Sequence, residues 1–178
     1  MVRRRGQPIH GWVNLDKPLG ISSAKALAIV RRAFDAAKAG HGGTLDPLAS
    51  GVLPIALGEA TKNVSYTMGK SKSYQFSLAW GAETNTDDTE GEVIRQSNRR
   101  PSDADIDRAL EQFHGVIDQV PPDYSAIKID GVRAYDLARQ VGTGQPLPML
   151  KPREVRIDQF RRLDSNQVGA RFFVRCGK

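Results

Sequence analysis

One carboxylate stands apart in residues 41–58, because Asp46 carries the only charged side chain in this stretch. A pair of glycines shortly before it has access to backbone angles closed to other residues, and Pro47 biases Asp46 toward an extended conformation. A constrained backbone of this kind presents a single side chain in a fixed place, as a catalytic carboxylate requires. The alternative is that Asp46 organises a turn, as Asp before Pro commonly does, with residues 52–57 forming a buried strand or helical turn.

Other patterns that carry chemistry in proteins are weaker here. Asp87 and Asp88 lack further ligands at the spacing of a calcium loop, so we interpret them as part of a solvated loop. The three histidines are too scattered for a zinc motif, and the single cysteine, Cys176, excludes an internal disulfide framework and a Cys-rich metal site. We therefore expect no metal site.

Composition and charge narrow the class of protein. With 178 residues, of which 39% are hydrophobic, the chain is long enough for one domain with a sizeable core. A net charge of +6 and a pI near 9.7 favour a polyanionic partner. Residues 1–6 form a basic segment that we expect to be a disordered arm. No apolar run approaches the roughly 20 residues of a membrane span, so we expect a cytoplasmic protein with no membrane partner.

Hydrophobic periodicity predicts the elements that must position Asp46. Residues 11–16 alternate as in a strand, and Ser22 or Ser23 is a good N-cap for the helix that follows. The predicted apolar face of this helix comprises Leu27, Val30 and Phe34. Gly40 is placed to end the helix.

The second half of the chain also combines strands and helices. Residues 74–80 alternate as an amphipathic strand, and Tyr74 at its start is of a type found more often in a core or at its rim than in a base-stacking site. Ser102 opens a capping box with Asp105, which predicts a further helix. Because hairpins outnumber regular βαβ units, the whole pattern predicts an α+β domain.

Five stretches, in this order along the chain, resemble the successive motifs of TruB-type tRNA pseudouridine synthases. They are Leu15-Asp-Lys-Pro-Leu-Gly-Ile-Ser-Ser23, residues 39–55, Gly58-Glu-Ala-Thr-Lys62, Lys72-Ser-Tyr74 and Pro122-Asp-Tyr-Ser-Ala-Ile-Lys128. The run Gly-Gly-Thr-Leu-Asp-Pro-Leu-Ala-Ser-Gly around Asp46 is highly specific. The resemblance spans almost the whole chain.

This resemblance implies a fold, an activity and a partner. The fold would be the pseudouridine synthase catalytic fold over residues 7–178, a mixed, mainly antiparallel sheet flanked by helices, with an RNA-gripping insertion at about residues 121–152. The activity would be isomerisation of uridine 55 in the T loop of tRNA to pseudouridine, without a cofactor or metal. The partner would be the T-arm stem-loop of tRNA, and we expect a monomer.

The resemblance also assigns roles to particular residues. Asp46 corresponds to the catalytic aspartate, and aspartate is ionised at neutral pH, so it needs no helper base to act as a nucleophile. Tyr74 matches the tyrosine that stacks on the flipped base, close enough to the sugar to take part in proton removal. His41 matches a residue that enters the space vacated in the RNA loop, and its alternative is a hydrogen-bonded turn histidine. Lys17 would support the site, either by contacting RNA or structurally.

The insertion would supply the remaining RNA contacts. Tyr124 and Lys128 belong to the segment that, by resemblance, grips the T arm, and its loop-like composition suits a segment that orders on RNA.

The sequence departs from the family pattern after Lys178. The family continues into a Gly-Thr-Tyr-Ile-Arg motif, whose arginine pairs with the catalytic aspartate, and then into a C-terminal RNA-binding, PUA-like domain; neither is in this sequence. We therefore expect a fragment with weak or no turnover. Two alternatives stay open: a non-catalytic RNA-binding or tRNA-folding module, and a relative that acts on another RNA with a separate guide.

Overall fold

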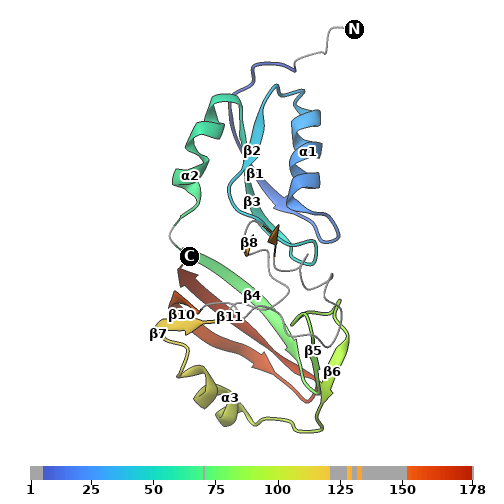
Figure 1. Ribbon diagram of the computed structural model, residues 1–178, viewed down its shortest axis with the longest axis vertical. Helices are drawn as coiled ribbons and strands as arrows, with labels where there is room; N and C mark the ends of the chain where they lie inside the picture. Colours follow the sequence, from blue (N-terminus) through green and yellow to red (C-terminus); the bar gives the residue numbers. More distant parts are fainter. Residues whose placement is uncertain (1–5, 70, 121–127, 130–131, 134–151, 178) are drawn as a thin grey trace. The chain divides into compact units, whose positions relative to one another are not determined.

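The computed structural model describes residues 6–69, 71–120, 128–129, 132–133 and 152–177 (Figure 1). The chain divides into two compact units, Met1–Gly69 and Lys70–Lys178, each with its own hydrophobic core. Antiparallel sheets and a few helices make up both units, which confirms the predicted α+β class. Asp46 lies in the first unit and Tyr74 in the second.

The first unit is built on a three-stranded antiparallel sheet with the order β1-β3-β2. These strands are β1 (Gly11–Lys17), β2 (Ala39–His41) and β3 (Gly51–Leu57). Alternate residues of β1 are less exposed than their neighbours, as the sequence predicts for residues 11–16. Residues 52–57 form the central strand, not a helical turn, and Leu53 and Ile55 are fully buried there.

Helix α1 (Ser23–Ala33) covers one side of this sheet, with Ala26 and Val30 buried against β3. Ser22 is its N-cap, because the Ser22 hydroxyl accepts a hydrogen bond from the backbone N–H of Lys25 at 3.2 Å. In Figure 1, η1 (Gly58–Asn63) and α2 (Val64–Thr67) continue from β3 on the other side of the sheet.

Two details of the predicted helix are wrong. The helix ends at Ala33, and Gly40 lies in β2 instead of closing the helix. Asp35 takes the positive φ of 45° that a closing glycine usually supplies, and the N–H of Ala36 then donates to the Arg31 carbonyl at 2.9 Å. Phe34 is the C-cap, is 44% exposed and is not part of the core that contains Leu27 and Val30.

The second unit contains a four-stranded antiparallel sheet with the order β4-β11-β10-β7. Its strands are β4 (Ser71–Ala79), β7 (Gly115–Gln119), β10 (Arg153–Ser165) and β11 (Gly169–Gly177). The predicted strand is confirmed over residues 74–79, with Tyr74, Phe76 and Leu78 opposite Val174, Phe172 and Ala170 of β11. All three side chains stay about 40% exposed, so the predicted alternation does not appear in their burial. Phe76, Phe160 and Phe172 form an aromatic cluster on this face.

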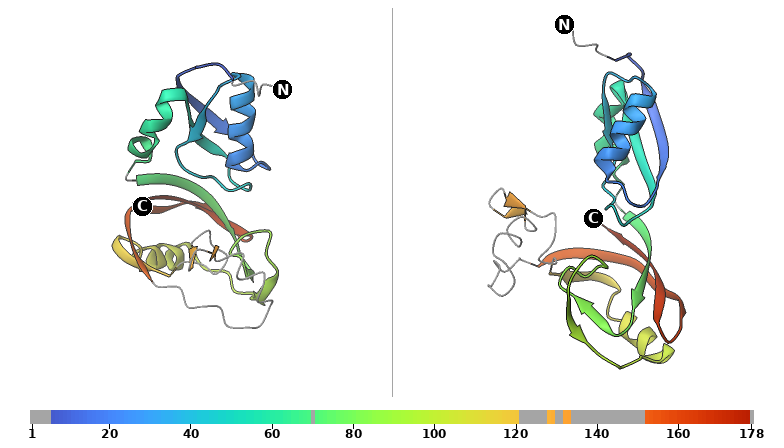
Figure 2. Two further views of the ribbon diagram at one scale, coloured as in Figure 1. Left: turned by 45° about the horizontal axis from the view of Figure 1, so that its top comes forward. Right: turned by 90° about the vertical axis from the view of Figure 1, so that its right-hand side faces the viewer.

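Helix α3 (Asp103–Leu110) packs on this sheet through Ile106, which shares the core with Ala170 and Phe172. The predicted capping box is confirmed, with Ser102 and Asp105 bonded reciprocally. Among the described residues of this unit, β5 (Ala82–Thr84) also pairs antiparallel with β6 (Val93–Gln96), and β8 (Lys128–Ile129) with β9 (Val132–Arg133) (Figure 2).

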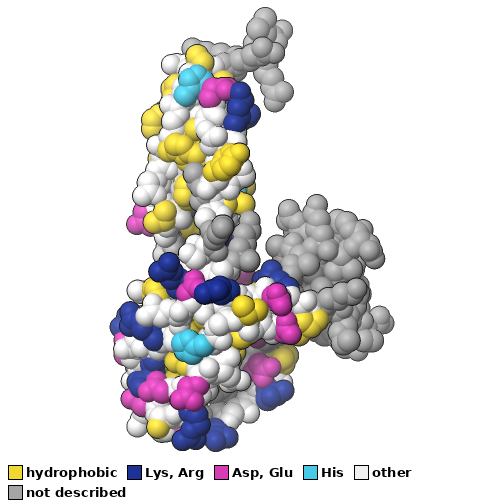
Figure 3. Space-filling model, turned by 90° about the vertical axis from the view of Figure 1, so that its left-hand side faces the viewer, with side chains coloured by type: hydrophobic (Ala, Val, Ile, Leu, Met, Phe, Trp, Pro, Cys, Tyr) yellow, Lys and Arg dark blue, Asp and Glu magenta, His cyan; other side chains and the backbone are white. Residues whose placement is uncertain are grey.

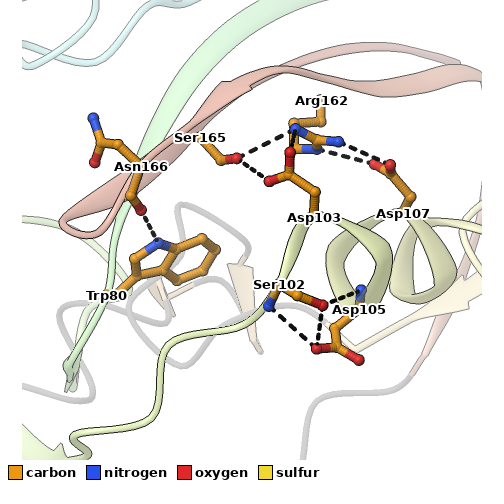
Figure 4. A network of polar contacts seen from close by, with 8 residues as sticks. All are labelled: Trp80, Ser102, Asp103, Asp105, Asp107, Arg162, Ser165 and Asn166. Carbon is orange, nitrogen blue, oxygen red and sulfur yellow. Dashed lines mark hydrogen bonds and ion pairs between the residues drawn. The ribbon is translucent and has the colours of Figure 1, made fainter.

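Charged side chains fasten α3 to β10 (Figure 4). The guanidinium of Arg162 binds Asp107 through two hydrogen bonds of 3.0 and 2.8 Å, and reaches Asp103 at 2.9 Å. Ser165 bridges Arg162 and Asp103. Hydrogen bonding to Arg162 lowers the pKa of Asp107, and the same contact raises the pKa of Arg162. We call these four residues the Arg162 network.

Candidate functional site

Asp46 lies in the loop that connects β2 to β3, and its side chain is exposed. The loop has no regular secondary structure, apart from a turn in which the Ala49 N–H donates to the Asp46 carbonyl at 3.0 Å. Asp46 is therefore part of a turn, which was the alternative interpretation of its sequence. Its side chain is nevertheless exposed to solvent. A carboxylate in this position is accessible to a substrate.

The backbone just before Asp46 is held by one buried hydroxyl. Ser23 Oγ donates to the Leu45 carbonyl at 2.9 Å and accepts from the Leu45 N–H at 2.9 Å. Ser23 is only 3% exposed, so water does not compete for these bonds. The Leu45 side chain packs against the core of the same unit. Leu45 is therefore fixed by its backbone and by its side chain.

The backbone just after Asp46 is held by the turn that follows β1. The Gly20 N–H donates to the Pro47 carbonyl at 2.8 Å. Gly20 has a φ of +80°, a left-handed conformation that glycine adopts without steric cost. The turn of residues 18–21 and the loop that carries Asp46 thus support one another.

Lys17 lies beneath this turn, with no exposed surface. Its ammonium donates to the Pro18 carbonyl at 2.9 Å and to the Ile21 carbonyl at 2.8 Å. A buried ammonium needs such acceptors, because it has given up its contacts with water. This placement contradicts the prediction of an RNA contact, since the side chain does not reach the surface. We assign Lys17 the structural role that the sequence left open.

His41 is the last residue of β2, five positions before Asp46. Its Nδ1 contacts the carbonyl of Gly43, and the neighbouring Gly42 N–H donates to the Pro54 carbonyl at 2.8 Å. These contacts fit the alternative of a hydrogen-bonded turn histidine. The side chain is half-buried, so part of its surface is accessible as well.

The carboxylate of Asp46 differs from many others in the molecule. Within residues 6–69 and the other described segments, no hydrogen bond or ion pair reaches it. By contrast Lys62 hydrogen-bonds to Glu59 and lowers the pKa of Glu59. Among the described residues there is also no group of three or more side chains that fits a metal ion. The loop thus leaves the Asp46 carboxylate accessible to a ligand, and the described residues do not form a metal-binding group.

The other predicted site residues lie in the second unit. Tyr74 is on β4 opposite Val174 and is 41% exposed, which places it at the rim of that core. Lys128 opens β8 and pairs with Arg133 through the backbone. Tyr124 lies outside the described residues. The structure therefore brings together Lys17, His41 and Asp46 within one unit.

Sequence reasoning missed Ser23 and Gly20, which hold the loop. One signal was present, because Ser22 and Ser23 are both good N-caps and a helix uses only one. The second serine was then free to bond elsewhere. A contact between residues 22 positions apart cannot be inferred from local patterns.

The two units differ in the kinds of side chain that they expose on one face of the molecule. On the face drawn in Figure 3, Lys, Arg, Asp and Glu side chains gather over the unit of residues 71–177, whereas hydrophobic side chains are frequent over the unit of residues 6–69.

No helix among the described residues has the length and apolar character needed to span a membrane.

The fold is that of pseudouridine synthases of the Cbf5 type. The structure is similar to a chain in the crystal structure of a Cbf5-Nop10-Gar1 complex, with a TM-score of 0.64 and 26% identity, over 94% of this chain and 39% of that chain. The family model "TruB family pseudouridylate synthase (N terminal domain)" matches residues 31–178. The chain belongs to this TruB family, as its motifs predict.

Named relatives have the same residue as this chain at about half of the aligned positions. The tRNA pseudouridine synthase B of Rhodopseudomonas palustris is 51% identical over 99% of this chain and 47% of the relative. The protein of the same name from Nitrobacter winogradskyi is 52% identical over 99% of this chain and 48% of the relative. The chain spans about half the length of these relatives.

Proposed function

We propose that this chain supplies the catalytic region of an isomerase that converts uridine 55 in the T loop of tRNA to pseudouridine, with Asp46 as the catalytic carboxylate. The observation that carries the proposal is an exposed carboxylate whose backbone neighbours are both hydrogen-bonded to fixed elements. Membership of the TruB family and the names of the relatives support the choice of reaction and of tRNA.

The reaction rearranges one nucleoside without adding or removing atoms. The bond between N1 of uracil and C1′ of ribose breaks, the base turns, and C5 of uracil forms a new bond to C1′. The proton on C5 leaves to solvent while N1 takes one up. A single ionised carboxylate suits this chemistry, because it assists cleavage of the glycosidic bond, whereas hydrolysis by a glycosidase uses two paired carboxylates.

The target base is stacked in folded RNA, so it must be extruded at a cost of a few kcal/mol. In our proposal Tyr74 stacks on the extruded base, which contributes about 1–3 kcal/mol and offsets much of that cost. The partial exposure of Tyr74 at the start of β4 is consistent with this role. His41 would enter the space that the base leaves, in addition to its contact with Gly43.

A chimera gives the sharpest test, since the chain spans about half of its relatives. In it, this chain replaces the matching segment of the Nitrobacter winogradskyi protein. The substrate is a T-arm stem-loop RNA labelled with tritium at C5 of its uridines, because formation of the C5–C1′ bond releases that hydrogen. We expect Asp46→Asn to abolish tritium release while the affinity for the RNA is retained. Asp35→Asn, which neutralises another exposed carboxylate of the same unit, is the matched control and should leave release unchanged.

Two results would contradict the proposal. If Asp46→Asn leaves tritium release unchanged, Asp46 is not catalytic, and an effect of the chain on tRNA folding that survives Asp46→Asn would favour the non-catalytic module. If the chimera acts only when a guide RNA is added, that result favours the other alternative, in which this chain belongs to a relative that modifies another RNA with a separate guide. Identity to the tRNA enzymes is about twice that to the Cbf5 chain, which supports the unguided tRNA substrate. Weak or no turnover by the 178-residue chain stays a prediction, and the same assay measures it.

A further inference from the structure

We infer that Ser23 is a positioning residue for Asp46: its hydroxyl sets the backbone that presents the carboxylate to the RNA. This inference rests on the proposed function, because it concerns the same carboxylate. No motif in the sequence assigns this role to Ser23, and the contact joins residues 22 positions apart.

At Ser23 one side-chain atom bonds both backbone groups of a single residue, Leu45. Ser23 Oγ donates to the Leu45 carbonyl and accepts from the Leu45 N–H, each at 2.9 Å. A hydroxyl has one hydrogen to donate and lone pairs to accept, so it can satisfy both groups at once. Leu45 lies in an irregular loop and is partly buried, where unpaired backbone groups are costly. The hydroxyl therefore replaces the strand partner that Leu45 does not have.

The hydroxyl is itself held in place. Ser23 is the first residue of α1, and Ser22 already caps that helix, so the Ser23 side chain is not needed for capping. One turn later Ala26 is 1% exposed and packs in the core with Leu53 and Ile55 of β3. A side chain on a packed helix is located more precisely than one on a loop. The position of α1 is thus passed on to Leu45.

The other side of Asp46 is fixed independently by Gly20 and Pro47. Asp46 is consequently the single residue between two anchored neighbours. Removing the Ser23 hydroxyl frees the peptide groups on both sides of Leu45, and their rotation moves the attached Asp46 backbone. Misplacement of a reacting group by about 1 Å can cost roughly 100-fold in rate, so the effect should appear in the chemical step.

The first test measures single turnover in the chimera with the T-arm stem-loop RNA. We expect Ser23→Ala to lower the rate of tritium release by about 10- to 100-fold, with the dissociation constant of the RNA unchanged. Ser22→Ala is the matched control, because it removes the same hydroxyl one residue earlier and weakens the helix cap without touching Leu45. It should lower the thermal midpoint but leave the rate unchanged. Ser23→Cys has a similar volume and weaker hydrogen bonds, so its rate should fall between those of Ser23 and Ser23→Ala.

The second test uses the 178-residue chain itself and needs no turnover. In amide hydrogen exchange, Ser23→Ala should speed exchange at Leu45 by about 10-fold or more relative to the amides of β3, because the Leu45 N–H loses its acceptor, the Ser23 hydroxyl. Ser22→Ala should not change this ratio. If Ser23→Ala does not fold, Ser23→Cys decides by the same two measurements.

The outcomes separate this inference from the proposed function. If Asp46→Asn abolishes release while Ser23→Ala retains the rate within about twofold, the positioning role is wrong and the proposed function stands. If Ser23→Ala and Ser22→Ala lower the rate equally, the effect of Ser23 is only on stability, which also overturns the inference. If Asp46→Asn leaves release intact, the proposed function itself fails.

Discussion

Two groups of carboxylates in this molecule are held in opposite ways. Asp103 and Asp107 on α3 are bound to Arg162 through short, charge-assisted hydrogen bonds (Figure 4). Asp46 receives no such partner from the described residues, and its loop is held instead by neutral groups on Ser23 and Gly20. The first arrangement uses the charge of the carboxylate to hold the structure, whereas the second leaves the charge available.

This difference separates carboxylates that hold the described structure together from one that does not. Asp103 and Asp107 use their charge and hydrogen-bonding capacity to join α3 to β10 through Arg162. The carboxylate of Asp46 joins no described elements, and its backbone is fixed by Ser23 and Gly20 instead. The comparison predicts that substitutions in the two regions separate activity from stability.

The largest contrast is expected between Asp46→Asn and Asp107→Asn in the chimera. Asp46→Asn should reduce pseudouridine formation by about 10³-fold. It should leave the thermal stability of the 178-residue chain unchanged, because its carboxylate contacts no other described side chain there. Asp107→Asn should lower the thermal midpoint, since it breaks the bidentate contact with Arg162, and leave product formation unchanged. Tritium release and thermal unfolding measure the two effects. A large loss of activity in Asp107→Asn would end the distinction between the two regions.

The next largest effect is expected at the buried lysine under the Asp46 loop. Lys17→Met keeps the apolar stem but leaves the carbonyls of Pro18 and Ile21 without their donor. The free energy of unfolding should fall by about 2 kcal/mol, the range for hydrogen bonds from a charged donor. Lys25→Met, at an exposed position of α1, should change it by less than about 0.5 kcal/mol. Urea unfolding of the 178-residue chain gives both values, and equal effects would show that burial of Lys17 has no energetic role.

A smaller effect is expected from the turn that supports Pro47. Gly20→Ala places a side chain in open space, but at a φ of +80°, so the cost is conformational and about 1 kcal/mol. Gly40→Ala is a suitable control, because its added carbon would only make ordinary contacts with Thr61 and Val64. Chemical unfolding compares the two variants. A Gly20→Ala variant as stable as Gly40→Ala would argue against strain at this turn.

The smallest effect is expected from acid, because exposed ion pairs contribute little to stability. The pKa values of Asp107 and Asp164 are lowered by hydrogen bonds from Arg162 and Arg171. A lowered folded pKa means that the stabilisation is complete above the ordinary value of about 4 and is lost as the pH falls through the lowered value. Amide exchange should therefore rise in α3 and β10 at pH 3 before it rises at Leu45, whose bonds to Ser23 involve no titrating group. The reverse order would contradict the assignment of charged and neutral contacts.

Much of the local structure follows from the sequence because it depends on neighbouring residues. The alternation of residues 11–16 and 74–80 predicts β1 and β4, and the pair Ser102 and Asp105 predicts the start of α3. The predicted end of α1 was wrong. Asp35 takes the left-handed conformation that glycine usually supplies, so the chain reverses before Gly40.

The sequence by itself determined which family this chain belongs to and which carboxylate is the candidate for chemistry, because the motif around Asp46 is contiguous. Tertiary structure alone decided how that carboxylate is held and which nearby residues are available to RNA. Lys17 lies on the same, less exposed side of β1 as Val13 and Leu15. Only the packed turn, however, shows that its ammonium is buried against two carbonyls. The bonds of Ser23 to Leu45 likewise join distant residues, and such contacts exist only once the core has brought helix and loop together.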